Sequence, residues 1–127
     1  MNTLTKIAAA KGASRIVRTI RRLLGMREIV TCRRRGVMWE LDLKQGIDLS
    51  IYLFGAFEPE IFDYASHIIK PGGKVLDIGA NIGAHTMRLA HLVGPSGAVF
   101  AFEPTDYAFE KLMRNIQLNL ILVSVES

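Results

Sequence analysis

The sequence lacks the features of disulfide-rich, zinc-binding, membrane-spanning and secreted proteins. Its 127 residues leave room for one domain at most, and a single cysteine, Cys32, allows no internal disulfide and suggests no zinc site. No apolar run approaches the roughly 18 residues of a membrane span. No apolar segment precedes a small-residue cleavage site, so a secretory signal is not expected. We therefore expect a cytoplasmic protein without a metal site.

Acidic residues are nearly missing from the first part of the chain. Residues 1–36 hold ten Lys or Arg and one acid, Glu28, whereas the remainder holds six basic and eleven acidic residues. The formal net charge of +4 therefore combines a segment of +9 with a remainder of −5. The basic character belongs to the N-terminal segment and not to the rest of the domain.

Residues 3–24 show helical spacing of apolar residues with Arg and Lys between them, and Gly25 is placed to end the helix. We treat residues 1–26 as a basic amphipathic helix. Three interpretations remain open: a helix that packs on the body or is partly disordered, a helix on an anionic membrane surface, and a targeting peptide. Nucleic-acid binding is not expected, because Arg33-Arg34-Arg35 is a short cluster without interleaved aromatic residues.

Residues 27–57 form a β-rich lead-in segment. Two extended stretches, 28–33 and 37–43, flank Arg34-Arg35-Gly36, which suits a hairpin turn. Apolar residues also alternate from Ile47 to Leu53, which predicts a third extended stretch over 47–54.

Residues 58–127 alternate between helical and extended patterns. A helix over 58–70 opens with Pro59, a strand follows at 74–78, and a second helix spans 82–93. The next strand covers 98–102, and a third helix begins near Thr105 with Phe109, Leu112, Met113, Ile116 and Leu120 on its apolar face. Residues 120–125 could begin a third strand. We predict that 75–78 is buried on both faces.

Candidate site residues gather where the two predicted parallel strands end. Asp77 lies near the end of the first strand, Gly79 and Gly83 allow a tight turn into the helix, and Glu103 ends the second strand. Ligands of open α/β sheets bind outside the carboxyl ends of the strands, so these residues should converge on one crevice. Thr86, on the first turn of the helix, is a further candidate contact.

The spacing favours an adenosine cofactor without a pyrophosphate. The dinucleotide fingerprint G-x-G-x-x-G/A needs bare backbone at its second glycine, where this chain has Asn81. S-adenosylmethionine contains adenosine but no phosphates, so it does not require bare backbone at that position. Glu103 follows Gly79 at about the 20-residue spacing of a ribose-binding acid. Asp77 would meet the cofactor ammonium, and the turn amides with the helix N-terminus would meet its carboxylate.

These residues resemble a known family, the FkbM-type methyltransferases, which use S-adenosylmethionine to methylate hydroxyl groups. The similarity covers roughly residues 36–119. It rests on Trp39-Glu40-Leu41-Asp42-Leu43, Gly46-Ile47-Asp48, Gly55-x-Phe57-Glu58-Pro59, Val75-Leu76-Asp77-Ile78-Gly79-Ala80-Asn81-Ile82-Gly83, Val99-Phe100-Ala101-Phe102-Glu103-Pro104 and Asn115-x-x-x-Asn119.

The resemblance implies an α/β, Rossmann-like class I methyltransferase fold that stops after about the second or third core strand. It places Asp77, Gly79, Asn81 and Gly83 on the methionine side of the cofactor and Glu103 on the ribose, and it brings Glu58 towards the same crevice. The implied acceptor is a hydroxyl of a small molecule or glycan. We expect the chain to be an inactive fragment, so no catalytic residue is assigned. An NAD(P)-dependent oxidoreductase fragment and a non-enzymatic membrane-surface module are the alternatives.

Overall fold

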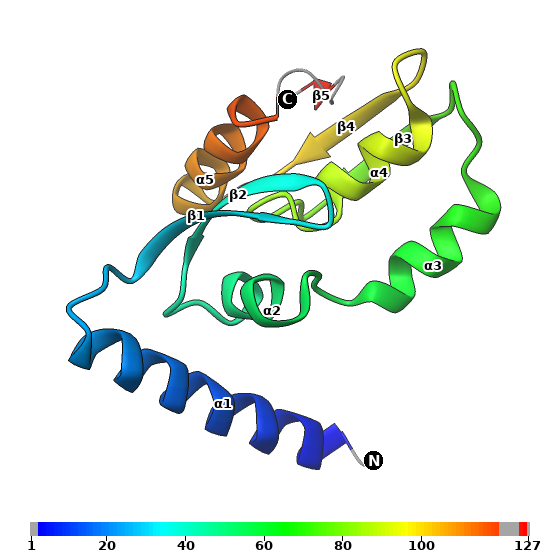
Figure 1. Ribbon diagram of the computed structural model, residues 1–127. Helices are drawn as coiled ribbons and strands as arrows, with labels where there is room; N and C mark the ends of the chain where they lie inside the picture. The colour runs from blue at the N-terminus through cyan, green and yellow to red at the C-terminus, as the bar shows by residue number, and fades with distance from the viewer. Residues whose placement is uncertain (1–2, 120–124, 127) are drawn as a thin grey trace.

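The computed structural model describes residues 3–119 and 125–126, with side chains from residue 11 to 119 (Figure 1). Its elements follow the chain in this order: α1 (Thr3–Leu23), β1 (Ile29–Arg34), β2 (Val37–Asp42), α2 (Gly46–Phe54), α3 (Pro59–Ile68), β3 (Lys74–Ile78), α4 (Thr86–Val93), β4 (Ala98–Phe102), α5 (Asp106–Gln117) and β5 (Val125–Glu126).

A parallel sheet with the strand order β3-β4-β5 forms one layer of the molecule. β3 and β4 run in register, from Lys74 beside Ala98 to Ile78 beside Phe102, so both strands end at the same edge. α4 packs on β3 and β4, and Val99 of β4 has no exposed surface. The other face is exposed at Leu76 (64%) and Ile78 (81%). The prediction that 75–78 is buried on both faces was therefore wrong, since the described helices cover one face.

The lead-in hairpin confirms the sequence prediction. β1 and β2 pair antiparallel, and their two-residue turn holds Arg35 at φ 47° and Gly36 at φ 83°. Two successive positive φ angles match the twist of a hairpin, and glycine adopts this region without steric cost. Along β2 the side chains of Val37, Trp39 and Leu41 are buried. The hairpin therefore contributes one wall of the main hydrophobic core.

The third extended stretch predicted at 47–54 was wrong, because these residues form α2. The helix buries Asp48, Leu49 and Ile51, and Gly55 ends it in the left-handed region at φ 79°. Most positions of this short helix are apolar, so alternate apolar residues imitate a strand. Gly55, placed as a helix C-cap, was the signal for a helix.

The remaining elements agree with the predicted order, with one shifted boundary. The helix expected from residue 82 begins at Thr86, because Asn81 (φ 50°) and Gly83 (φ 91°) cannot continue a right-handed helix. β5 pairs parallel with β4, Val99 beside Val125, and the rest of the strand predicted from 120 lies outside the described residues, as does Leu120. On α5, Leu112 and Ile116 are buried as predicted, whereas Phe109 is 38% exposed.

Candidate active site

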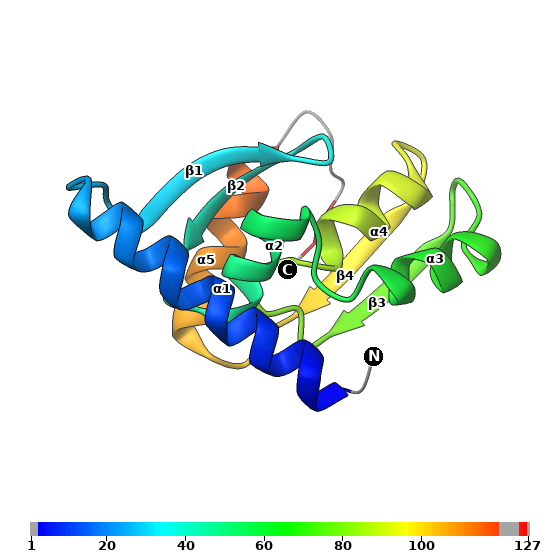
Figure 2. The same cartoon turned by 60° about the horizontal axis from the view of Figure 1, so that its bottom comes forward.

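Hydrogen bonds join the loop after β3 to the end of β4. The sequence predicts that the glycine turn and the ends of the two strands converge. The amides of Gly79 and Ala80 both donate to the carbonyl oxygen of Phe102, at 2.8 and 3.0 Å. The carboxyl ends of the two strands and the glycine loop therefore meet at one edge of the sheet, which Figure 2 shows from below.

Glu103 joins three segments at this edge. Its Oε2 accepts the amide of Asn81 at 2.9 Å, and its Oε1 accepts the amide and the hydroxyl of Thr105 at 2.9 and 2.5 Å. The hydroxyl and amide of Thr105, followed by the amide of Asn81, hold the pKa of Glu103 below its ordinary value of 4.5. The carboxylate is thus ionised at neutral pH, and three of its roughly four acceptor positions are in use.

Asn81 adopts the left-handed region at φ 50°, and its Oδ1 accepts the amide of Ile82 at 2.9 Å. The amide of Gly83 donates to Ala80, so all five amides from Gly79 to Gly83 have acceptors inside the protein. These donors are paired within the protein in this structure, and the expected contact of the turn amides with a cofactor carboxylate stays a prediction.

The two site glycines have different surroundings. A Cβ at Gly79 (φ 80°) would meet no atom within 4 Å, so its backbone lies open to a ligand. A Cβ at Gly83 would come within 2.9 Å of Leu112 Cδ1 and 3.3 Å of Met87 Cε. Gly83 therefore permits close packing of the loop on α4 and α5.

Asp77 and Thr86 form a pair beneath the loop. The Thr86 hydroxyl donates to Asp77 Oδ2 at 2.5 Å, and Thr86 has no exposed surface. Asp77 is 9% exposed. In this structure Thr86 acts on Asp77 and orients its carboxylate, while its predicted contact with the cofactor stays a prediction.

Glu58 and His85 form a second pair at the start of α4, and the sequence did not indicate that these two side chains meet. His85 Nε2 lies 3.4 Å from Glu58 Oε2, and the ring of Phe57 is 6.0 Å from that of His85. Glu58 adopts φ 43°, a rare conformation for a residue with a side chain, and such strain is often found at functional sites. The structure thus places Glu58 near the beginning of α4.

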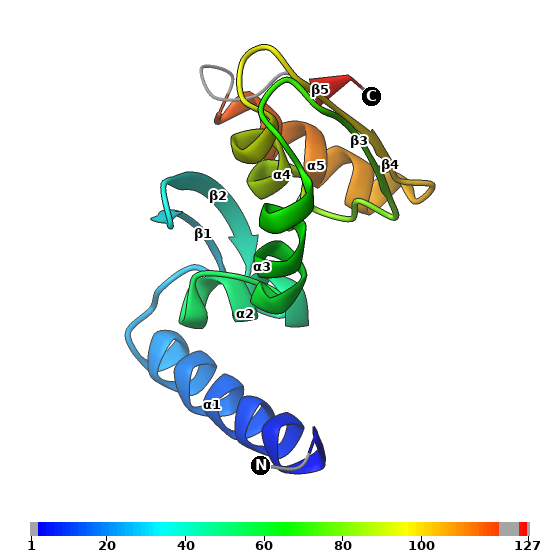
Figure 3. The ribbon, with the colours of Figure 1, turned by 90° about the vertical axis from the view of Figure 1, so that its right-hand side faces the viewer.

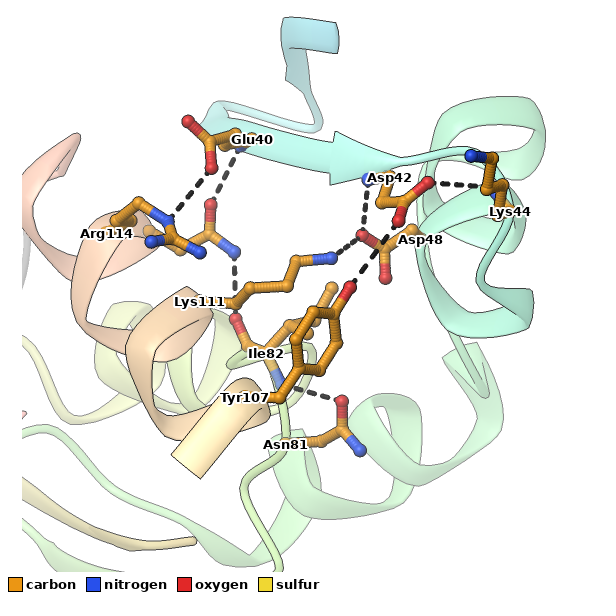
Figure 4. Close-up of polar contacts among 10 residues, drawn as sticks. Glu40, Asp42, Lys44, Asp48, Asn81, Ile82, Tyr107, Lys111 and Arg114 are labelled. Carbon is orange, nitrogen blue, oxygen red and sulfur yellow. Dashed lines mark hydrogen bonds and ion pairs between the residues drawn. The ribbon is translucent and has the colours of Figure 1, made fainter. Parts of the chain in front are cut away.

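A buried ion pair between α2 and α5 was also missed by the sequence analysis. Lys111 Nζ donates to Asp48 Oδ2, and the two side chains are 4% and 1% exposed. The same oxygen of Asp48 accepts the amide of Asp42 at 2.7 Å (Figure 4). Each residue appears polar and solvent-facing in its sequence pattern, so nothing in the spacing predicts that they meet. The pair fixes α5 against the lead-in.

Asn115 of α5 and Asn119, two residues beyond the end of that helix, bond to the free edge of β2. Asn115 Oδ1 accepts the amide of Glu40 at 2.8 Å, and its Nδ2 donates to Ile82 O at 3.0 Å. Asn119 accepts the amide of Met38 at 2.9 Å and donates to the carbonyl of the same residue at 2.7 Å. These side chains replace a neighbouring strand, and Asn115 links the hairpin to the glycine loop.

A pocket of about 200 Å³ opens beside Asn81, between the starts of α2 and α5. Tyr107 stands at this pocket with its hydroxyl 3.5 Å from Asp42 Oδ2. Burial, and then the carboxylates of Asp42 and Asp48, raise the pKa of Tyr107, so its hydroxyl stays protonated at neutral pH. The lining consists of Gln45, Gly46, Ile47, Asp48, Asn81, Ile82, Thr105, Tyr107 and Ala108.

Comparison with known proteins finds short partial matches to methyltransferases. The chain is 39% identical over 49 residues to a protein-L-isoaspartate O-methyltransferase of Methanothrix thermoacetophila, covering 39% of this chain and 23% of that one. It is 47% identical over 47 residues to the 31-O-demethyl-FK506 methyltransferase FkbM of Streptomyces tacrolimicus, covering 37% and 18%. The chain therefore spans about a fifth of the length of these relatives. No protein-family model matches it.

Solved structures agree on the architecture. The chain matches the TYW2 protein of M. jannaschii in complex with AdoMet with a TM-score of 0.56 and 24% identity, covering 78% of this chain and 42% of that one. It matches a SAM-dependent methyltransferase from Aquifex aeolicus with a TM-score of 0.51 and 28% identity, covering 65% and 42%. The fold is a partial class I methyltransferase fold. The predicted Rossmann-like α/β class is thus confirmed, and the chain resembles S-adenosylmethionine-dependent methyltransferases.

The part of the chain from residue 3 to 119 contains no helix long and apolar enough to cross a membrane.

Proposed function

We propose that this chain forms the S-adenosylmethionine-binding part of an FkbM-type O-methyltransferase. The observation that carries the proposal is the closed glycine loop beside an ionised carboxylate. Every amide from Gly79 to Gly83 is paired internally, and Glu103 stands at the strand edge with its pKa lowered. Such an edge offers few donors to phosphates, and the Glu103 carboxylate can accept a hydroxyl group where the Thr105 hydroxyl gives way.

A dinucleotide suits this edge poorly. Pyrophosphate binding relies on free backbone amides at the turn and on close approach of bare backbone at the second glycine. Here the Asn81 side chain occupies that position and bonds to its own chain, and the Asn81 amide is taken by Glu103. This geometry favours S-adenosylmethionine over NAD(P).

The residues present fit the parts of S-adenosylmethionine. Glu103 would accept the ribose hydroxyls, with the Thr105 hydroxyl as the internal donor that gives way. Asp77, oriented by Thr86, would hold the ammonium, and the open backbone at Gly79 leaves room beside it. The cofactor, when bound, supplies an electrophilic methyl group.

The proposal also specifies the type of methyltransferase, FkbM, and the acceptor of the methyl group, a hydroxyl. The similarity at 47% identity over 47 residues supports the FkbM type, and the protein matched there is named as a methyltransferase of an O-demethyl substrate. A small molecule or glycan with a free hydroxyl is the acceptor class that we propose. The protein-L-isoaspartate O-methyltransferase also transfers to oxygen, which supports O-methylation in general.

A binding titration tests the cofactor. We expect S-adenosylhomocysteine to bind and NADH not to bind, by calorimetry. Glu103→Gln should weaken binding of S-adenosylhomocysteine by roughly 10- to 100-fold, since hydrogen bonds to charged groups contribute about 1.5–3 kcal/mol. Glu110→Gln makes the same charge change on an exposed part of α5, where the side chain is 68% exposed, and should leave the affinity unchanged. NADH binding as tight as that of S-adenosylhomocysteine would overturn the proposal.

A further inference from the structure

α1 carries a row of exposed aliphatic side chains. Ile16, Ile20 and Leu23 of α1 are 62%, 51% and 81% exposed, and Leu24, the residue directly after the helix, is 68% exposed; we call these four residues the apolar stripe. Their spacing of i, i+4, i+7 and i+8 puts them on one side of the helix. An apolar side of an amphipathic helix ordinarily faces a core, so its exposure here needs an explanation.

The body contacts a different side of α1. The Arg21 guanidinium donates to the Tyr52 hydroxyl at 3.2 Å and lies 5.7 Å from the centre of its ring. A hollow of about 400 Å³ lies between α1 and α2, and Lys11, Arg15 and Arg18 line its α1 side. The body therefore meets polar side chains of α1, and Figure 3 shows the helix at the periphery of the molecule.

The charge around the apolar stripe narrows the choice of partner. Residues 1–36 hold ten basic residues and one acid. At the end of the helix the Arg22 side chain is 79% exposed, and Arg27 is exposed just beyond it. An apolar stripe with many cations near it is typical of helices that lie in the interface of an anionic bilayer. A second protein surface would have to be apolar and acidic at once to match both features.

We propose that α1 is an interfacial membrane anchor that binds anionic lipid surfaces. The apolar stripe enters the boundary between headgroups and acyl chains, and the neighbouring arginines reach the phosphates by extending their side chains. The helix of 21 residues, about 30 Å long, lies along the surface. The Arg21–Tyr52 contact keeps the body on the water side.

Co-sedimentation of the full chain with vesicles tests this proposal. We expect binding to vesicles that contain phosphatidylglycerol and little binding to pure phosphatidylcholine. Ile20→Gln/Leu23→Gln removes apolar surface without changing charge and should lower the partition coefficient at least tenfold. Arg22→Gln/Arg27→Gln should lower it roughly fivefold for each charge removed, and added salt should weaken wild-type binding.

The matched control is Ile61→Gln/Ile68→Gln on α3. These two isoleucines are 49% and 58% exposed, so this variant removes similar apolar surface elsewhere and should bind as the wild type does. Circular dichroism of each variant confirms that it is folded. Equal binding by the Ile20/Leu23 variant and the wild type would overturn the proposal. The proposal would also be overturned if the wild type did not bind vesicles but sedimented as a dimer, and if Ile20→Gln/Leu23→Gln abolished that dimer. The apolar stripe would then bind a second copy of the chain.

Discussion

The buried pair of Asp48 and Lys111 yields the sharpest stability prediction. Lys111→Met keeps most of the volume of the side chain but removes its charge. Asp48 is 1% exposed, and after the change its carboxylate keeps the amide of Asp42 as its remaining donor among the described residues. A buried carboxylate without its cation is strongly unfavourable, because water can no longer solvate it.

The expected cost is large relative to the whole stability of such a domain. Removing one partner of a buried pair costs about 3–5 kcal/mol of unfolding free energy, whereas small domains have about 5–15 kcal/mol in total. Asp48→Asn/Lys111→Met should recover most of that loss, because the amide oxygen of asparagine still accepts from Asp42 and no charge stays buried. Arg114→Met is the matched control, since its guanidinium bonds Glu40 at 3.0 Å but the side chain is 46% exposed. That control should cost less than about 1 kcal/mol.

Urea unfolding followed by fluorescence measures these differences. Trp39, the one tryptophan of the chain, is 2% exposed in the core between the hairpin and α2, so its emission reports on this region. Equal m-values across the variants show that the same transition is compared. The reasoning is refuted if Lys111→Met costs no more than Arg114→Met, or if the double variant is less stable than Lys111→Met alone.

Three further predictions follow from single contacts. Gly83→Ala should destabilise by about 1–3 kcal/mol through its positive φ and the close approach to α5. Gly79→Ala shares the strain of a positive φ but meets open space, so it should cost less, and equal urea midpoints would contradict this. Asn119→Ala should speed amide hydrogen exchange in β2, and unchanged exchange there would refute its role. Thr105→Val should raise the pKa of Glu103 towards 4.5, measured by carboxyl NMR titration. Because a lowered folded-state pKa stabilises above the unfolded pKa, this variant should lose less stability as pH falls through the folded pKa than the wild type loses.

Local chemistry made much of the fold predictable. The hairpin follows from alternation around an Arg35-Gly36 turn, and the β3–loop–α4–β4 unit follows from apolar runs bounded by glycines. Leu112 and Ile116 were assigned to the core from helical spacing alone. In each instance the deciding interaction lies within a few residues along the chain, where periodicity and turn chemistry act.

Contacts between distant segments were not predictable. In the sequence Asp48 is a polar residue between apolar ones. Its carboxylate is buried because it pairs with Lys111, which lies 63 positions away. Thr86 is a good candidate ligand by position, yet its depth under the loop is set by packing on the sheet. The left-handed conformation of Glu58 has no sequence signal at all. For the proposed site, the sequence predicts which edge of the sheet binds the ligand, and tertiary packing decides which groups remain available there.

The most direct test of the central claim is to locate the cofactor site by NMR. The isotopically labelled chain is titrated with S-adenosylhomocysteine, and backbone amide shifts are followed. We predict saturable shifts at Gly79, Asn81 and Thr105, the residues around the Glu103 carboxylate. Shifts confined to α1 and α2, or shifts at the glycine loop produced equally by NADH, would contradict the assignment of this edge to S-adenosylmethionine.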